Sequence, residues 1–184
     1  MPEQVQNSSA HLLRCLRMPD SLHYEIVVDH TETSKQCTIL PLRDREDFKI
    51  TRFRTTNAPR KLSSDILLHP DGISLAELKS DSITKIAALD CIWRRLNTIL
   101  NYTLEPLPKF VSIPPGFLTA YPRKDKHGVD PSAGFATIEA LFITAAFLGT
   151  WDLTLLEKYY FGDRFLEINA EAFSKYRLGP NQRY

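Results

Sequence analysis

Short runs of apolar and β-branched residues, separated by turn-forming and charged residues, predict β-strands in the first part of the chain. The runs at 85–91 and 109–113 are mostly apolar, which is typical of strands buried on both faces of a parallel sheet. The Pro-Asp-Gly signal at residues 70–72 predicts a turn. The predicted strands are His23 to Asp29, Phe48 to Arg54, Asp65 to Leu68, Lys85 to Cys91 and Lys109 to Ile113.

Other segments carry apolar residues at helical spacing. The strongest of them, Phe135 to Leu148, is almost entirely apolar and is followed by Gly149, a common helix end. Strands that alternate with helices predict an α/β domain with a largely parallel sheet. The polar, aperiodic residues 1–22 predict a loosely held tail before one domain over residues 23–184. The further helical segments are Leu75 to Ser82, Ile92 to Leu100, Asp152 to Tyr160 and Asp163 to Tyr176.

Composition and missing motifs exclude several functional classes. The 184 residues suffice for one domain with a substantial core. Three cysteines without a Cys-x-x-Cys pair, and five histidines without metal-ligand spacing, predict neither a disulfide framework nor a metal site. The sequences G-x-G-x-x-G, G-x-x-x-x-G-K-[ST] and G-x-S-x-G do not occur, which argues against dinucleotide, P-loop and serine-hydrolase sites. No segment resembles a membrane span or a secretory signal, so we expect a cytoplasmic protein.

The charge balance is informative only locally, because the formal net charge is +1 and RNA-binding proteins are usually more basic. Between Arg43 and Lys61, seven basic residues accompany three acidic ones, and a second basic cluster follows near residue 124. Such runs either contact phosphates or form an ordinary solvated face. The candidate RNA-binding residues are Arg43, Arg45, Arg52, Arg54, Arg60, Lys61, Arg123 and Lys124.

Chemically unusual residues follow the predicted strands. In open α/β sheets ligands bind beyond the carboxyl ends of the strands, so Asp90, near the end of the run 85–91, and Trp93, just after it, are site candidates. Thr137 and Glu139 open the apolar helix, where backbone N–H groups can meet a polar ligand. Each residue also has a structural interpretation: Asp90 as a helix cap, Trp93 as core, and the pair on the apolar helix as helix-end residues.

These residues, in this order, resemble the DTW-domain superfamily, and most of all its ribosome-biogenesis aminocarboxypropyltransferases, which modify small-subunit ribosomal RNA. The resemblance covers roughly Tyr24 to Tyr176. It departs from the family pattern at Ser112 to Phe117, and the stretch onward to Gly134 is more similar to the transfer-RNA enzymes. The motifs that carry it are Lys35-Gln36-Cys37-Thr38, Ile66-Leu67-Leu68-His69-Pro70, Asp90-Cys91-x-Trp93, Leu107-Pro108, Tyr121-x-Arg123, Ala136-Thr137-Ile138-Glu139-Ala140 and the segment Leu155 to Asn169.

The resemblance implies a SPOUT-like α/β fold with a knotted C-terminal part that binds S-adenosylmethionine, although protein knots are exceptional. Residues 23–84 would face RNA and residues 85–184 would hold the cofactor. Asp90 is the implied catalytic residue, and the indole of Trp93 would cover the methyl group of the cofactor. The implied cofactor-binding residues are Thr38, Leu89, Asp90, Trp93, Val111, Ile113, Pro114, Tyr121, Phe135, Ala136 and Thr137.

The implied reaction transfers the 3-amino-3-carboxypropyl group to N3 of a uridine or a modified pseudouridine, without a metal. The RNA partner would be the pre-ribosomal small subunit, with transfer RNA as the alternative, and a monomer is favoured. Two other functions remain open. The protein could be a SPOUT-type RNA methyltransferase, or an inactive RNA-binding assembly factor.

Overall fold

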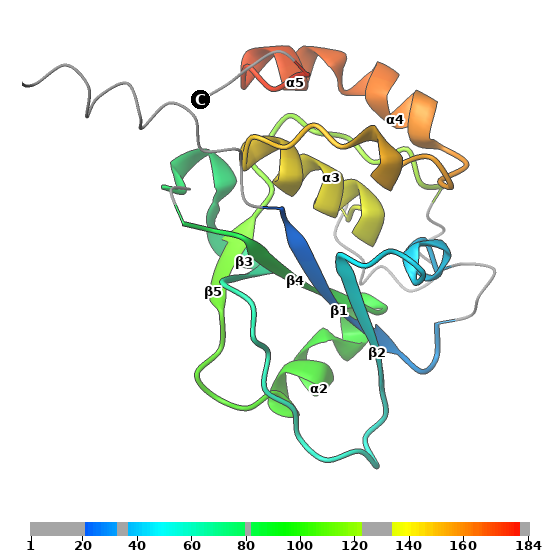
Figure 1. The fold of residues 1–184 in the computed structure, drawn as a ribbon, viewed down its shortest axis with the longest axis vertical. Helices are drawn as coiled ribbons and strands as arrows, with labels where there is room; N and C mark the ends of the chain where they lie inside the picture. Colours follow the sequence, from blue (N-terminus) through cyan, green and yellow to red (C-terminus); the bar gives the residue numbers. More distant parts are fainter. Residues whose placement is uncertain (1–20, 33–36, 80–81, 123–133, 181–184) are drawn as a thin grey trace, which may run out of the picture.

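Five parallel strands form one sheet in the order β2-β1-β4-β3-β5 (Figure 1). The computed structural model describes residues 21–32, 37–79, 82–122 and 134–180. The parallel sheet and its flanking helices confirm the predicted α/β class. The strands are β1 (His23–Asp29), β2 (Phe48–Phe53), β3 (Ile66–Ser74), β4 (Lys85–Asp90) and β5 (Lys109–Ser112).

Helices cover both faces of the sheet, as a parallel sheet requires. The three helices of the C-terminal half, α3, α4 and α5, lie on one face, and α2 lies on the other (Figure 1). The α-helices are α2 (Leu96–Asn101), α3 (Thr137–Phe147), α4 (Gly162–Ile168) and α5 (Ala170–Lys175). Short 3₁₀ turns lie between these elements: η2 (Leu40–Leu42), η3 (Leu75–Glu77), η4 (Trp93–Arg95) and η5 (Leu153–Leu155).

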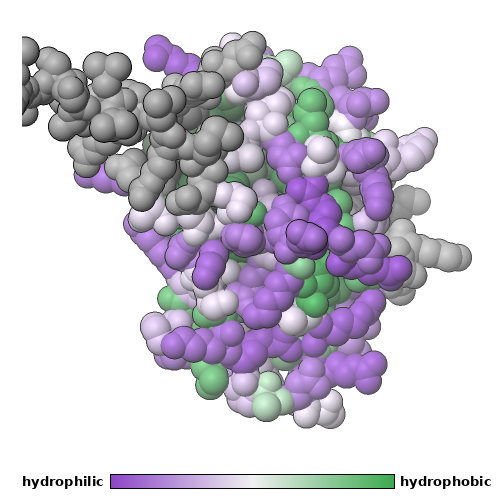
Figure 2. Space-filling view, in the orientation of Figure 1, coloured by the Kyte–Doolittle hydropathy of each residue, from purple (hydrophilic) through white to green (hydrophobic). Residues whose placement is uncertain are grey.

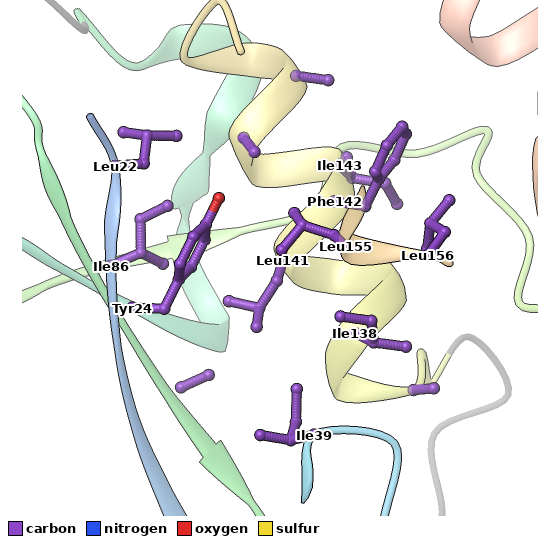
Figure 3. Packing of buried hydrophobic residues seen from close by; sticks show 14 of the residues in the cluster. Leu22, Tyr24, Ile39, Ile86, Ile138, Leu141, Phe142, Ile143, Leu155 and Leu156 are labelled. Carbon is purple, nitrogen blue, oxygen red and sulfur yellow. The ribbon is translucent and has the colours of Figure 1, made fainter. Parts of the chain in front are cut away.

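Two hydrophobic cores lie on opposite faces of the sheet because neighbouring strand residues point to opposite sides. In β1, Tyr24 and Ile26 belong to the larger core under α3, whereas Val27 belongs to the smaller core beside α2. Ile39 is completely buried in the larger core, which also contains Ile138 of α3 (Figure 3), so the segment after residue 37 is anchored in that core.

The turn predicted at residues 70–72 lies inside a strand instead. β3 extends to Ser74 and carries an irregularity between Leu68 and Ile73, after which its pairing with β5 resumes. Gly72 is required there, because a Cβ atom would lie 2.3 Å from the backbone nitrogen of Val111. The predicted strand end was therefore wrong, since the Pro-Asp-Gly sequence forms a β-bulge.

Two predicted helical segments are also interrupted. Within 152–160 only η5 is helical, and the second segment divides into α4 and α5 at Asn169. The side chain of Asn169 is completely buried and donates hydrogen bonds to the carbonyl oxygens of Phe165 and Leu118, while accepting one from the Leu118 backbone N–H. An asparagine that bonds backbone in this way competes with the helix and fixes the loop instead.

The surface seen in Figure 2 is mainly hydrophilic, with hydrophobic residues scattered among charged ones. Within the described part of the chain, every helix is too short or too polar to span a membrane. The tail predicted for residues 1–22 lies almost wholly outside the described residues.

Candidate functional site

Asp90, the last residue of β4, joins three segments at the carboxyl edge of the sheet. Its side chain is buried, with 8% exposed, and points to the face covered by α3. One carboxylate oxygen accepts a hydrogen bond from Cys37 Sγ at 2.8 Å, and the other accepts from Thr137 Oγ1 at 2.7 Å. The turn that follows begins at Ile92 without a side-chain cap, so the interpretation of Asp90 as a helix cap is wrong.

The thiol of Cys37 is the donor that ties residues 37–39 to this carboxylate. Burial and the negative charge of Asp90 raise the pKa of Cys37 to about 12, so the group remains a neutral donor at physiological pH. Thr38 follows directly and is partly exposed. The tertiary fold thus brings Thr137 into contact with Asp90, and places Thr38 next to Cys37, the other residue that contacts this carboxylate.

Glu139 holds the start of α3 and the loop before it. Its completely buried carboxylate accepts hydrogen bonds from the backbone N–H of Ala136 (2.9 Å) and from Thr119 Oγ1 (2.6 Å). The backbone N–H of Ala120 and the hydroxyl of Tyr159 donate to its other oxygen. Four donors leave little room for a ligand, which confirms the interpretation of Glu139 as a helix-end residue.

Trp93 lies outside both hydrophobic cores of the described chain, although tryptophan is usually buried. It begins η4, three residues after Asp90, and is partly exposed. Its Nε1 is shielded from solvent but has no hydrogen-bond partner within the described chain. An indole of this kind is suited to contact a ligand at the carboxyl edge, and it contributes little to the core.

The other predicted cofactor-binding residues lie in three places. Val111, Ile113 and Pro114 are at or beyond the end of β5, which β3 separates from β4. Phe135, Ala136 and Thr137 are at the start of α3, and the ring of Tyr121 packs edge-on against Phe161. Leu89 packs toward the α2 face, so its side chain lies on the opposite side of the sheet from Asp90.

The basic residues predicted to bind RNA divide into paired and exposed groups. Arg45 forms ion pairs with Asp47 at 2.8 Å and Asp152 at 2.9 Å, so its charge is already neutralised within the protein. Arg52 and Arg54 are exposed at the end of β2. Arg43 and Lys61 are exposed as well, although Arg43 lies 3.7 Å from the carboxylate of Asp44. Arg60 is partly buried and donates to Thr51 and the Arg52 carbonyl. Arg123 and Lys124 lie outside the described residues.

A second buried carboxylate, Asp29, was missed by sequence reasoning. It ends β1 beside β4, is completely buried, and accepts two hydrogen bonds from Arg95 of η4. The sequence pattern that pointed to Asp90 also applies to Asp29, because each of the two residues ends a buried strand. Its partner lies 66 positions further along the chain, which no local pattern predicts.

Metal ligands do not gather in the described part of the chain: no group of three or more His, Cys, Asp or Glu side chains could hold an ion there. Asp90 and Asp29, the carboxylates at this edge, instead accept hydrogen bonds from protein donors.

Comparison with solved structures gives a similarity in fold. The chain is similar to the structure of the SAM-dependent rRNA:acp-transferase Tsr3 from Vulcanisaeta distributa, with a TM-score of 0.57 and 19% sequence identity. The match covers 84% of this chain and 83% of that one, so the fold is shared over most of both molecules. No protein-family model and no curated protein matches the sequence.

Proposed function

We propose that this chain is an enzyme that transfers the 3-amino-3-carboxypropyl group of S-adenosylmethionine to N3 of a uridine-type base in RNA, with small-subunit ribosomal RNA as the substrate. The observation that carries the proposal is the juxtaposition of Asp90, Cys37 and Thr137 at the carboxyl edge of a fold shared with an rRNA:acp-transferase. These are residues of the motifs through which the sequence resembles that enzyme class. We also propose that the fold is of the SPOUT-like class and that its C-terminal part is knotted.

The residues present fit an S-adenosylmethionine site. When bound, the cofactor would supply a sulfonium whose three attached carbons are electrophilic. Trp93 provides an apolar surface that is not used by either core, which suits a wall against the methyl carbon. Thr38 has a partly exposed hydroxyl side chain beside Cys37, and we assign it to the amino-acid end of the cofactor.

Residues beyond β5 and at the start of α3 would hold the adenosine part. Loop and strand-end backbone at 111–114 offers N–H and C=O groups, and Tyr121 adds an aromatic side chain. Ala136 begins α3 with extended backbone, which leaves the first N–H groups of the helix to meet polar atoms.

We assign Asp90 a hydrogen-bonding role toward the base or the cofactor ammonium. Each of its oxygens already accepts one hydrogen bond and retains a second lone pair. The carboxylate can therefore orient N3–H of the base, or accept its proton, while Cys37 and Thr137 keep it in place. Holding the base in line with the chosen carbon is the main contribution such a site can make.

The direct test is the mass of the modified nucleoside. Purified protein is incubated with S-adenosylmethionine and either small-subunit ribosomal RNA or transfer RNA, with and without a chelator, and the digested nucleosides are analysed by mass spectrometry. We expect an aminocarboxypropyl nucleoside from the ribosomal RNA, and loss of it in Asp90→Asn.

Each alternative gives a different result. A methylated nucleoside would make the chain an RNA methyltransferase. Failure to bind S-adenosylmethionine in calorimetry, with RNA binding retained, would favour an assembly factor. Product from transfer RNA alone would change the substrate class, and product lost on chelation would contradict a metal-independent reaction.

A further inference from the structure

Trp93 begins η4, a short turn that an ion pair between Arg95 and Asp29 joins to the end of β1. η4 contains only Trp93, Arg94 and Arg95, and no side chain caps its start. Its backbone is held by the hydrogen bond from Arg95 N–H to the Ile92 carbonyl at 2.9 Å and by the bond from Leu96 N–H to the Trp93 carbonyl. A single turn of this kind is weakly determined by itself.

Arg95 connects this turn to the end of β1. Its Nε donates to one oxygen of Asp29 at 2.7 Å and its Nη2 donates to the other at 3.1 Å, which is a two-point contact. The guanidinium also lies 6.0 Å from the ring centre of Phe53, the residue paired with Asp29 in β2. The side chain is thereby held against both β1 and β2.

Asp29 is itself held rigidly. Its side chain is completely buried and also accepts hydrogen bonds from Thr31 Oγ1 at 2.7 Å and His30 Nδ1 at 3.0 Å. Burial alone would raise the pKa of Asp29, but the hydrogen bonds from Arg95, Thr31 and His30 outweigh it, and the pKa is lowered. The carboxylate is therefore charged at neutral pH, when its attraction for the guanidinium is greatest.

The indole of Trp93 has no comparable anchor of its own. It belongs to neither core, and its Nε1 has no partner in the described chain. The backbone of η4 consequently decides where the ring lies. Two residues away, Arg95 attaches this backbone to the ends of β1 and β2, while α2, which follows directly, packs on the sheet through Ile99.

We infer that Asp29 and Arg95 are positioning residues that set the place of Trp93, and thereby decide which carbon of the cofactor is kept from the RNA. The inference rests on the proposed function for its chemical meaning. The two carboxylates at the edge then have separate tasks: Asp90 connects β4 with α3, and Asp29 connects η4 with β1.

A single-tryptophan protein tests the structural part without substrate. Trp151→Phe leaves Trp93 as the only tryptophan, because the chain has two. In this background Asp29→Asn and Arg95→Gln should raise acrylamide quenching of Trp93 fluorescence and shift its emission to longer wavelength. Arg95→Lys should give an intermediate effect, since an ammonium keeps the charge but cannot reproduce the planar two-point contact.

Glu25→Gln is the matched control. Glu25 lies near the other end of β1, is 8% exposed, and accepts hydrogen bonds from Lys49, Ser63 and Ser64. Its substitution disturbs a comparable network far from η4 and should leave Trp93 quenching unchanged. Circular dichroism establishes which variants are folded, and Arg95→Lys serves if Asp29→Asn does not fold. Unchanged quenching in a folded Arg95 variant would overturn the inference.

The chemical part is tested by product analysis. In the otherwise wild-type protein, Arg95→Lys should lower kcat for aminocarboxypropyl transfer by up to about a hundredfold if Trp93 is displaced by about 1 Å. The KM for S-adenosylmethionine should rise by a smaller factor. A methylated product should appear beside the normal one. If the wild-type protein forms no aminocarboxypropyl product, the proposed function fails, whereas the quenching result still decides the positioning role. Equal loss in kcat and in folded fraction would show that Arg95 is only structural.

Discussion

Trp93 and Trp151, the two tryptophans of the chain, are both partly exposed but differ in what they pack against. Trp151 packs edge-on against Phe142 and Phe173, with ring centres 5.0 Å apart in each case. Trp93 packs into neither core of the described chain. The same residue type thus stabilises the fold at one position and is available to a ligand at the other.

This contrast predicts different results for the two alanine variants. Trp151→Ala should lower stability by about 3–5 kcal/mol, which is usual for a large aromatic residue removed from a core. Trp93→Ala should lower the melting temperature much less, yet reduce aminocarboxypropyl transfer by about a hundredfold, because the wall beside the methyl carbon opens. Thermal melts and product mass measure both effects. A Trp93→Ala protein that melts far lower but transfers at the normal rate would make Trp93 a packing residue.

At the level of elements, β2 brings exposed cations to the edge that carries the site. Val28 of β1 pairs with Arg52 on one side and with Asp90 on the other. Adjacent strands lie about 4.8 Å apart, so the backbones of Arg52 and Asp90 are separated by about 10 Å. Arg45, by contrast, is paired with two carboxylates and is excluded from this surface.

We therefore predict that Arg52 and Arg54 contact RNA phosphates. The double variant Arg52→Gln/Arg54→Gln should weaken RNA binding and reduce the slope of log K against log salt by about 1.5, because two phosphate contacts are lost. Affinity for S-adenosylmethionine should stay the same. Filter binding or fluorescence anisotropy at several salt concentrations measures the slope.

Lys85 and Lys109 supply the matched control. They are exposed and begin β4 and β5, at the amino edge of the same sheet. Lys85→Gln/Lys109→Gln changes the net charge equally but should leave the slope unaltered. Equal slopes for the two double variants would mean that the end of β2 is only a solvated face.

At the scale of the whole molecule, three buried or half-buried carboxylates should make the free energy of unfolding depend on pH. The pKa values of Glu25, Asp29 and Asp152 are all lowered, because hydrogen bonds from cationic and hydroxyl groups outweigh the effect of burial. A group whose pKa is lowered on folding stabilises the protein above its unfolded pKa, and this contribution is lost as the pH falls through the folded value.

We expect urea unfolding to give a nearly constant midpoint between pH 7 and pH 5, and a steep fall below about pH 4, the usual pKa of unfolded carboxyl groups. Glu25→Gln should have lower stability at neutral pH and a shallower fall, since one of the three titrating groups is absent. A variant with the same acid dependence as the wild type would show that Glu25 does not contribute to it.

The amino-acid sequence by itself determined the elements that depend on local patterns. β1 runs from His23 to Asp29 as predicted, and the apolar run that forms β4 ends at Asp90, one residue earlier than expected. Continuous apolar segments of this length have few alternatives to a buried parallel strand. The place of Asp90 and Trp93 at the end of a predicted strand also predicted a site there, because ligands of open parallel sheets bind at the carboxyl ends of the strands.

The tertiary structure alone decided which of these residues meet. Asp90 finds Cys37 and Thr137 at separations of 53 and 47 positions, and Asp29 finds Arg95 at 66. It also turned Pro70-Asp71-Gly72 into a bulge, since Gly72 must let the backbone of Val111 approach closely. Such contacts depend on strand order and on the packing of α3 against β4. The spacing of apolar residues along the chain indicates the type of element and its buried face. It does not indicate which distant side chain will donate a hydrogen bond to a given carboxylate.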